Sequence, residues 1–222
     1  MPEVIFQGSD GRLEGRYIHG EGPNAPLAIV LHPHPQYGGT MNNRVVHGMF
    51  RMFQRRGFSV LRFNFRGVGR SQGVFDHGQG ELRDAAAALD WMQSHNPNSN
   101  VAWVAGFSFG AWIAMQLLMR RPEIQGFMCA GLPANMYDFT FLAPCPSSGL
   151  IVHGERDSVT PTESVVKLVN KLSQQRGITI DFHQIEAADH VFGNRMDELE
   201  DICENYLDRR LKPASDRMAV GR

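Results

Sequence analysis

The sequence predicts an α/β fold in which a mostly parallel central sheet carries helices on both faces. Short apolar segments alternate along the chain with longer segments of helical periodicity. Strands that alternate with helices in this way are joined by right-handed crossovers, which make neighbouring strands parallel. The 222 residues, 42% hydrophobic and 20% charged, suffice for one domain with a substantial core.

The elements follow one another in a regular order. A hairpin comes first, with strands over 4–7 and 13–19 around the turn sequence Ser9-Asp10-Gly11. Six further strands are expected over 27–31, 59–63, 101–105, 125–130, 150–152 and 178–185. The first five are short apolar runs, and the last is a longer segment in which apolar and polar residues alternate. Helical periodicity lies between them, over 43–56, 81–94, 111–120, 163–175 and 196–211. We assign residues 1–212 to this single domain and expect 213–222, after Pro213, to be a mobile C-terminal tail.

Charge and cysteine content exclude several classes of protein. The formal net charge of -1 gives no general attraction to nucleic acid or to an anionic membrane. Cys129, Cys145 and Cys203 lie far apart, with neither metal-ligand spacing nor an even number for disulfides, which favours a reducing compartment. The N-terminus lacks the features of a signal peptide, and no apolar run is long enough to span a bilayer. We therefore expect a cytoplasmic protein with no nucleic-acid partner, and leave its oligomeric state open, a homo-oligomer included.

The most informative segment is Gly106-Phe-Ser108-Phe-Gly110, which lies between an apolar strand and a helix. A Gly-x-Ser-x-Gly sequence in this context makes a sharp turn that places the serine in a strained, exposed position. The helix N-terminus below the serine favours a developing negative charge. The alternative is an ordinary glycine-rich turn, but the strand before and the helix after favour Ser108 as a nucleophile.

A serine nucleophile needs a base, and the base needs an orienting acid. After Ser108 in the chain, an acid is offered by the loop that follows strand 150–152, where Asp157 is preferred to Glu155 because Glu155 lies closer to the strand end. His190 then follows the last strand. The order Ser108, Asp157, His190 predicts a catalytic triad.

Four segments together resemble the serine hydrolases of the α/β-hydrolase fold, and the resemblance runs from about residue 27 to 211. They are the nucleophile turn, the acid loop His-Gly-Glu-Arg-Asp-Ser-Val-Thr-Pro, the histidine loop Asp-His-Val-Phe, and the turn Arg66-Gly-Val-Gly-Arg-Ser71. Asn64 stands where many members carry Asp, a departure that concerns the geometry of that turn. The resemblance is to small bacterial esterase-like members with little or no lid and with a His-Pro-His-Pro loop.

That loop follows the first core strand as His32-Pro33-His34-Pro35. Members of the fold place an oxyanion donor here, commonly within a His-Gly-x pattern, and His34 falls at x. Acyl transfer needs two preorganised donors for the carbonyl oxygen. The resemblance implies the backbone N–H of Phe109 and that of His34, since the neighbouring prolines have no amide hydrogen.

Metal binding is the alternative for these histidines. His32 and His34 are two residues apart on an extended segment, so they point in opposite directions, and no acidic ligand lies nearby in the sequence. We expect neither a metal nor an organic cofactor.

Many members of the fold carry a lid domain after the strand that ends near residue 130. Here only residues 131–149 separate that strand from the acid-bearing strand, which allows a loop and one short helix over 135–141 but no separate lid domain. An open site follows from this, and we expect Tyr37, Met136 and Tyr137 to edge an acyl pocket. A helix that packs on the sheet would need similar residues.

The sequence thus predicts a serine hydrolase that cleaves carboxylic esters, or thioesters, of small acyl substrates through an acyl-enzyme intermediate. An aminopeptidase or an acyltransferase on the same triad remains an alternative. A further alternative is a ligand-binding protein that keeps the fold without turnover, because fold alone does not determine function.

Overall fold

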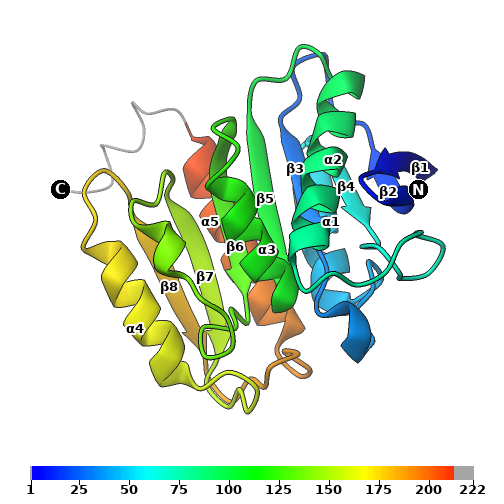
Figure 1. Ribbon diagram of the computed structural model, residues 1–222. Helices are drawn as coiled ribbons and strands as arrows, with labels where there is room; N and C mark the ends of the chain where they lie inside the picture. Colours follow the sequence, from blue (N-terminus) through cyan, green and yellow to red (C-terminus); the bar gives the residue numbers. More distant parts are fainter. Residues whose placement is uncertain (1, 213–222) are drawn as a thin grey trace.

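The central sheet has eight strands in the order β1-β2-β4-β3-β5-β6-β7-β8 within residues 2–212, which are the residues that the computed structural model describes (Figure 1). The strands are β1 Glu3–Gly8, β2 Gly11–Ile18, β3 Leu27–Leu31, β4 Ser59–Phe63, β5 Ala102–Phe107, β6 Ile124–Ala130, β7 Gly149–Gly154 and β8 Ile180–Ile185. β2 is antiparallel to both β1 and β4, and the other neighbours are parallel. The predicted hairpin and mostly parallel sheet are confirmed. The expected C-terminal tail, residues 213–222, lies outside the described residues.

Helices cover both faces of the sheet, as predicted. Side chains of α2 (Gln79–His95), α3 (Phe109–Leu118) and α4 (Thr162–Ser173) form one buried cluster with one face of the strands. Side chains of α1 (Arg44–Arg55) and α5 (Met196–Leu211) form a second cluster with the opposite face (Figure 1). β3, β4 and β5 are buried throughout, which explains why their sequences are apolar runs without alternation. None of the described helices is long and apolar enough to cross a membrane.

The segment between β6 and β7 differs from the sequence prediction. No α-helix forms over 135–141, and the described chain there has turns and one 3₁₀ helix, η2 (Thr140–Leu142). The side chain of Asp138 accepts a hydrogen bond from Thr140 N at 2.8 Å, a local bond that competes with helical pairing. The segment is nevertheless too short for a lid domain, as predicted.

The connections place the functional loops at one edge. β3, β5, β6, β7 and β8 run parallel, so the loops that follow them all leave from the same edge of the sheet. The chain proceeds from β3 to β4, which lies on one side of β3, and then to β5, which lies on the other side of β3. Such a reversal of strand order opens a crevice at the carboxyl ends of the strands, where α/β proteins bind their ligands.

Candidate active site

Ser108 occupies a sharp turn between β5 and α3. Its backbone has φ 53° and ψ -120°, a positive φ that residues other than glycine seldom adopt. A Cβ atom on Gly106 would lie 2.4 Å from the carbonyl oxygen of Gly110, and one on Gly110 would lie 2.3 Å from that of Leu31. Both glycines are therefore required by close backbone contacts. The serine is strained as predicted, but it is only 8% exposed, so the expectation of an exposed serine is wrong.

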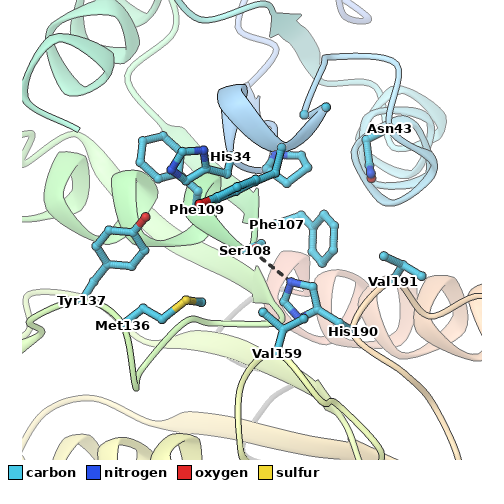
Figure 2. Close-up of a pocket in the computed structure, with 14 residues that line it drawn as sticks. His34, Asn43, Phe107, Ser108, Phe109, Met136, Tyr137, Val159, His190 and Val191 are labelled. Carbon is cyan, nitrogen blue, oxygen red and sulfur yellow. Dashed lines mark hydrogen bonds between the residues drawn. The ribbon is translucent and has the colours of Figure 1, made fainter. Parts of the chain in front are cut away.

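The three predicted residues lie in one hydrogen-bonded chain. His190 Nε2 is 3.0 Å from Ser108 Oγ (Figure 2), and His190 Nδ1 is 2.7 Å from Asp157 Oδ2. An ionised carboxylate only accepts hydrogen bonds, so Nδ1 carries the imidazole proton and Nε2 is free to accept the serine proton.

Asp157 is held in a fully buried position. Its Oδ1 accepts the amides of Val159 at 2.9 Å and Thr160 at 2.8 Å. Burial alone would raise the pKa of this carboxyl, but the hydrogen bonds from His190 and Thr160 outweigh burial and hold the pKa below its ordinary value. Glu155 instead accepts the amide of Ala187 at 2.8 Å in an exposed setting and does not pair with His190.

Two further glycines make room for the histidine loop. A Cβ on Gly131, whose φ is +57°, would lie 3.1 Å from His190 Cε1. A Cβ on Gly154 would lie 2.6 Å from the carbonyl oxygen of Ala188. Sequence reasoning missed both residues. Their only signal was the position of a glycine at or just after the end of a buried strand.

His34 and Phe109 lie together over the serine. Phe109 is the first residue of α3, where backbone amides have no partner within the helix. His34 precedes a 3₁₀ helix, η1 (Pro35–Tyr37), and its ring centroid is 5.0 Å from that of Phe109. The His34 side chain is engaged locally, because its Nδ1 accepts the amide of Gln36 at 3.2 Å. A Cβ on Gly39 would lie 2.1 Å from Pro33 O, so the loop folds tightly back on itself.

His32 anchors this loop to the neighbouring one. Its ring is fully buried, its Nε2 accepts the amide of Phe65 at 3.0 Å, and its Nδ1 donates to the carbonyl of Pro33 at 2.6 Å. Burial lowers its pKa to about 4, so the ring is neutral at neutral pH. Both ring nitrogens are occupied. His32 therefore has no lone pair left for a metal, and residues 2–212 contain no cluster of three or more potential metal ligands.

Asn64 fixes the far end of the same loop. Its Oδ1 accepts the amide of Met41 at 2.8 Å, and its Nδ2 donates to Glu14 at 2.8 Å. Asp at this position could accept the first bond but could not donate the second. The sequence related this departure to the geometry of the turn over residues 66–71, whereas the Asn64 side chain here supports the loop after β3 and bonds to β2.

A pocket of about 430 Å³ opens above Ser108. The predicted residues Tyr37, Met136 and Tyr137 all line it, with Tyr37 86% exposed at the rim. The lining contains no Asp, Glu, Lys or Arg, and its members are Pro33, His34, Tyr37, Gly38, Gly39, Asn43, Phe107, Ser108, Phe109, Met136, Tyr137, Val159, His190 and Val191.

Known proteins share this fold and its length. A protein of unknown function from Agrobacterium tumefaciens is 62% identical in its crystal structure, with a TM-score of 0.93 over 95% of this chain and 96% of that one. A protein from Xanthomonas campestris, described as an α/β serine hydrolase without lid, is 30% identical, with a TM-score of 0.86 over 96% of each chain. An uncharacterized protein from Rickettsia prowazekii is 53% identical over 93% of this chain and 89% of its own length.

The fold and these relatives define the class as an α/β serine hydrolase without a lid domain. Within that class, the chain belongs to the family described as X-Pro dipeptidyl-peptidase (S15 family), whose model matches residues 20–143.

The neutral state of His32 predicts a loss of stability in acid. Its pKa is about 4 in the folded protein against 6.5 for an ordinary histidine, so below about pH 6.5 the unfolded chain takes up a proton that the folded chain does not. We expect this group to lower the free energy of unfolding by about 2 kcal/mol between pH 7.5 and pH 5. Urea unfolding at both pH values, with His32→Asn as the comparison, measures the effect. An equal pH dependence in the two proteins would contradict the assignment.

Proposed function

We propose that this chain hydrolyses carboxylic esters, with Ser108 as nucleophile, His190 as general base and Asp157 as the acid that orients it. The observation that carries the proposal is the unbroken chain of hydrogen bonds from Ser108 Oγ through His190 to Asp157, at 3.0 Å and 2.7 Å. A serine hydroxyl is a weak nucleophile until such a base removes its proton.

The reaction would proceed in two halves. His190 Nε2 takes the proton of Ser108 as Oγ attacks the ester carbonyl, and Asp157 stabilises the resulting imidazolium. The tetrahedral intermediate collapses, the alcohol leaves with the proton from His190, and an acyl-serine remains. Water then attacks the acyl-serine by the same proton path and releases the carboxylic acid. The side chains and water account for every proton and electron pair, so the mechanism calls for no metal or organic cofactor.

The carbonyl oxygen becomes negative during both halves. We assign its stabilisation to the backbone N–H groups of Phe109 and His34, which come from the start of α3 and the loop after β3. Donors fixed in advance by the fold stabilise this charge without reorganisation during the reaction.

An aminopeptidase is the main alternative, and the description of the family favours it. A peptidase that recognises the free N-terminus of its substrate needs a carboxylate to bind the ammonium group. Among the described residues, no Asp or Glu lines the pocket. Esters, thioesters included, need no such group. Parallel assays with a p-nitrophenyl ester and an X-Pro p-nitroanilide separate the two. The same ester assay in the presence of an added alcohol would detect acyl transfer.

We also propose a reducing, cytoplasmic setting and a small acyl substrate as partner. The three cysteines are free and buried, which fits a protein that forms no disulfides.

Replacement of Ser108 tests the nucleophile. Ser108→Ala should lower kcat for a short activated ester by a factor on the order of 10⁶, because the acyl-enzyme no longer forms. Ser158→Ala, in the acid loop, is the matched control and should keep most of the parental rate. Steady-state kinetics on folded variants measures both. Parental turnover by Ser108→Ala, or no turnover by the parent and by Ser108→Ala alike, would refute the proposal.

Two substitutions separate the backbone of His34 from its side chain. His34→Ala keeps the N–H and should retain most of the activity, whereas His34→Pro removes it and should cost about 2.7–4 kcal/mol of transition-state stabilisation. The φ of -53° at this residue is compatible with proline. The readout is kcat/KM for variants that melt cooperatively. A folded His34→Pro variant with parental activity would place the second donor elsewhere in the loop.

A further inference from the structure

The pocket extends to both sides of Ser108, and the two sides differ in character (Figure 2). Met136 and Tyr137 lie on one side of the serine, and Asn43 and Val191 lie on the other, beyond His190. This asymmetry bears on which part of a substrate each side would hold.

The side of Tyr137 is an aromatic wall. The Tyr137 ring stacks on Trp112, with centroids 4.2 Å apart and planes 19° apart, and its centroid is 6.0 Å from that of Phe109. The His34 ring continues the wall at 5.0 Å from Phe109. Interlocked rings of this kind present a rigid apolar surface.

The opposite side is open. Asn43 and Val191 border it, and Val191 is 52% exposed. Little on this side would restrict the size of a group bound there.

The rim of the pocket is unusually apolar. Seven large hydrophobic side chains are well exposed among the described residues, and four of them line this pocket. The four are Tyr37, Met136, Val159 and Val191. Exposed apolar side chains gathered at one place mark a binding surface rather than random surface residues.

We propose, on the basis of the function proposed above, that the Tyr137 side binds the acyl group and selects an uncharged aliphatic chain, while the Val191 side admits varied alcohols. The leaving oxygen must receive its proton from His190 Nε2, so the alcohol lies on the side of His190, and the acyl chain takes the side of Tyr137. A charged acyl group would lose its hydration there without gaining a partner, because the lining has no Asp, Glu, Lys or Arg.

A series of p-nitrophenyl esters from acetate to decanoate, with the anionic monosuccinate, tests this selection. For the parent, kcat/KM should rise about threefold for each added methylene until the wall is covered, and should be lowest for the succinate. Tyr137→Ala should flatten the rise, Tyr137→Phe should keep it, and Met136→Ala, at an exposed position, should weaken it for the longest chains. Val74→Ala, an exposed valine outside the pocket, should leave the whole profile unchanged.

Failure of this inference differs from failure of the proposed function. An active parent with a flat chain-length profile, or a Tyr137→Ala variant with the parental profile, would overturn the acyl assignment and leave the esterase intact. A folded parent that turns over none of the esters would overturn both.

A second inference rests on His153, a buried histidine that the mechanism does not use. Its side chain is fully buried at the end of β7, and its Nε2 donates to the carbonyl of Thr160 at 3.1 Å. Its Nδ1 is buried without a hydrogen-bond partner and lies 3.7 Å from Asp157 Oδ2, too far for a hydrogen bond.

We infer that His153 is a positioning residue for Asp157. The bond from Nε2 fixes Thr160, whose own amide holds Asp157 Oδ1 at 2.8 Å. His153 Nδ1 does not hydrogen-bond to Asp157 Oδ2, so Oδ2 accepts its bond from His190 without competition. The titratable groups that act on the His153 ring are Asp157 and His190.

The test compares His153→Phe, which removes the donor, with His153→Gln, whose amide nitrogen can replace Nε2. His153→Phe should lower kcat for an activated ester about tenfold with little change in KM, as expected for one lost hydrogen bond in the support of the triad. The acid limb of its pH profile should move to lower pH, because a less well held Asp157 stabilises the imidazolium less. His153→Gln should recover most of the rate.

A merely structural histidine would lower the melting temperature without moving the pH profile. A folded His153→Phe variant with the parental kcat and acid limb would overturn the inference. If that variant does not fold, His153→Asn, which is smaller and lacks a donor at the Nε2 position, takes its place with the same expected and contrary results.

Discussion

The backbone of Ser108 is the constraint on which the site depends. A positive φ at a residue with a side chain costs about 1–3 kcal/mol and persists only where the surrounding structure enforces it. Here the turn lies between two buried elements, since β5 is buried throughout and eight residues of α3 are buried. Close backbone contacts at Gly106 and Gly110 fix the turn between them. The same contacts bring the start of α3 against the end of β3, which is where the loop of His34 begins.

Loops from β7 and β8 must then meet this fixed turn. Gly154 lets the acid loop approach the histidine loop, and Gly131 leaves room for the imidazole. Asp157 keeps its charge inside the protein because two backbone amides and His190 replace the water it has lost. The triad is preorganised: Ser108, His190 and Asp157 are already joined by hydrogen bonds before a substrate arrives.

Local sequence was sufficient where structure and chemistry depend on local spacing. Apolar runs predicted β3 and β4 with their observed bounds, and the helical pattern predicted α5 in the same way. The Gly-x-Ser-x-Gly spacing predicted the strained turn, because both glycines are required by close backbone contacts within the motif or with the adjacent strand. The order of the acid and histidine loops predicted which side chains would meet.

The sequence was insufficient where a residue's role depends on a side-chain contact that periodicity and motif spacing do not report. The helix expected over 135–141 does not form, since the side chain of Asp138 bonds to a nearby amide instead. Ser108 is only 8% exposed, and the periodicity of its own segment does not report the exposure of a residue in a turn. Gly131 is required by its contact with His190, more than fifty positions away in the sequence. His153 acts through Thr160, seven positions away, and the pattern of its own strand does not indicate this contact.

The central claim is that three loops converge to hold one reacting carbonyl at Ser108. A crystal structure of the protein after reaction with an alkyl fluorophosphonate tests it most directly, because the adduct mimics the tetrahedral intermediate. We predict phosphorus bonded to Ser108 Oγ, its negative oxygen about 2.7–3.1 Å from the amides of both Phe109 and His34, and the alkyl chain against Tyr137. An adduct on another serine, or a phosphoryl oxygen that faces away from both amides, would contradict the account.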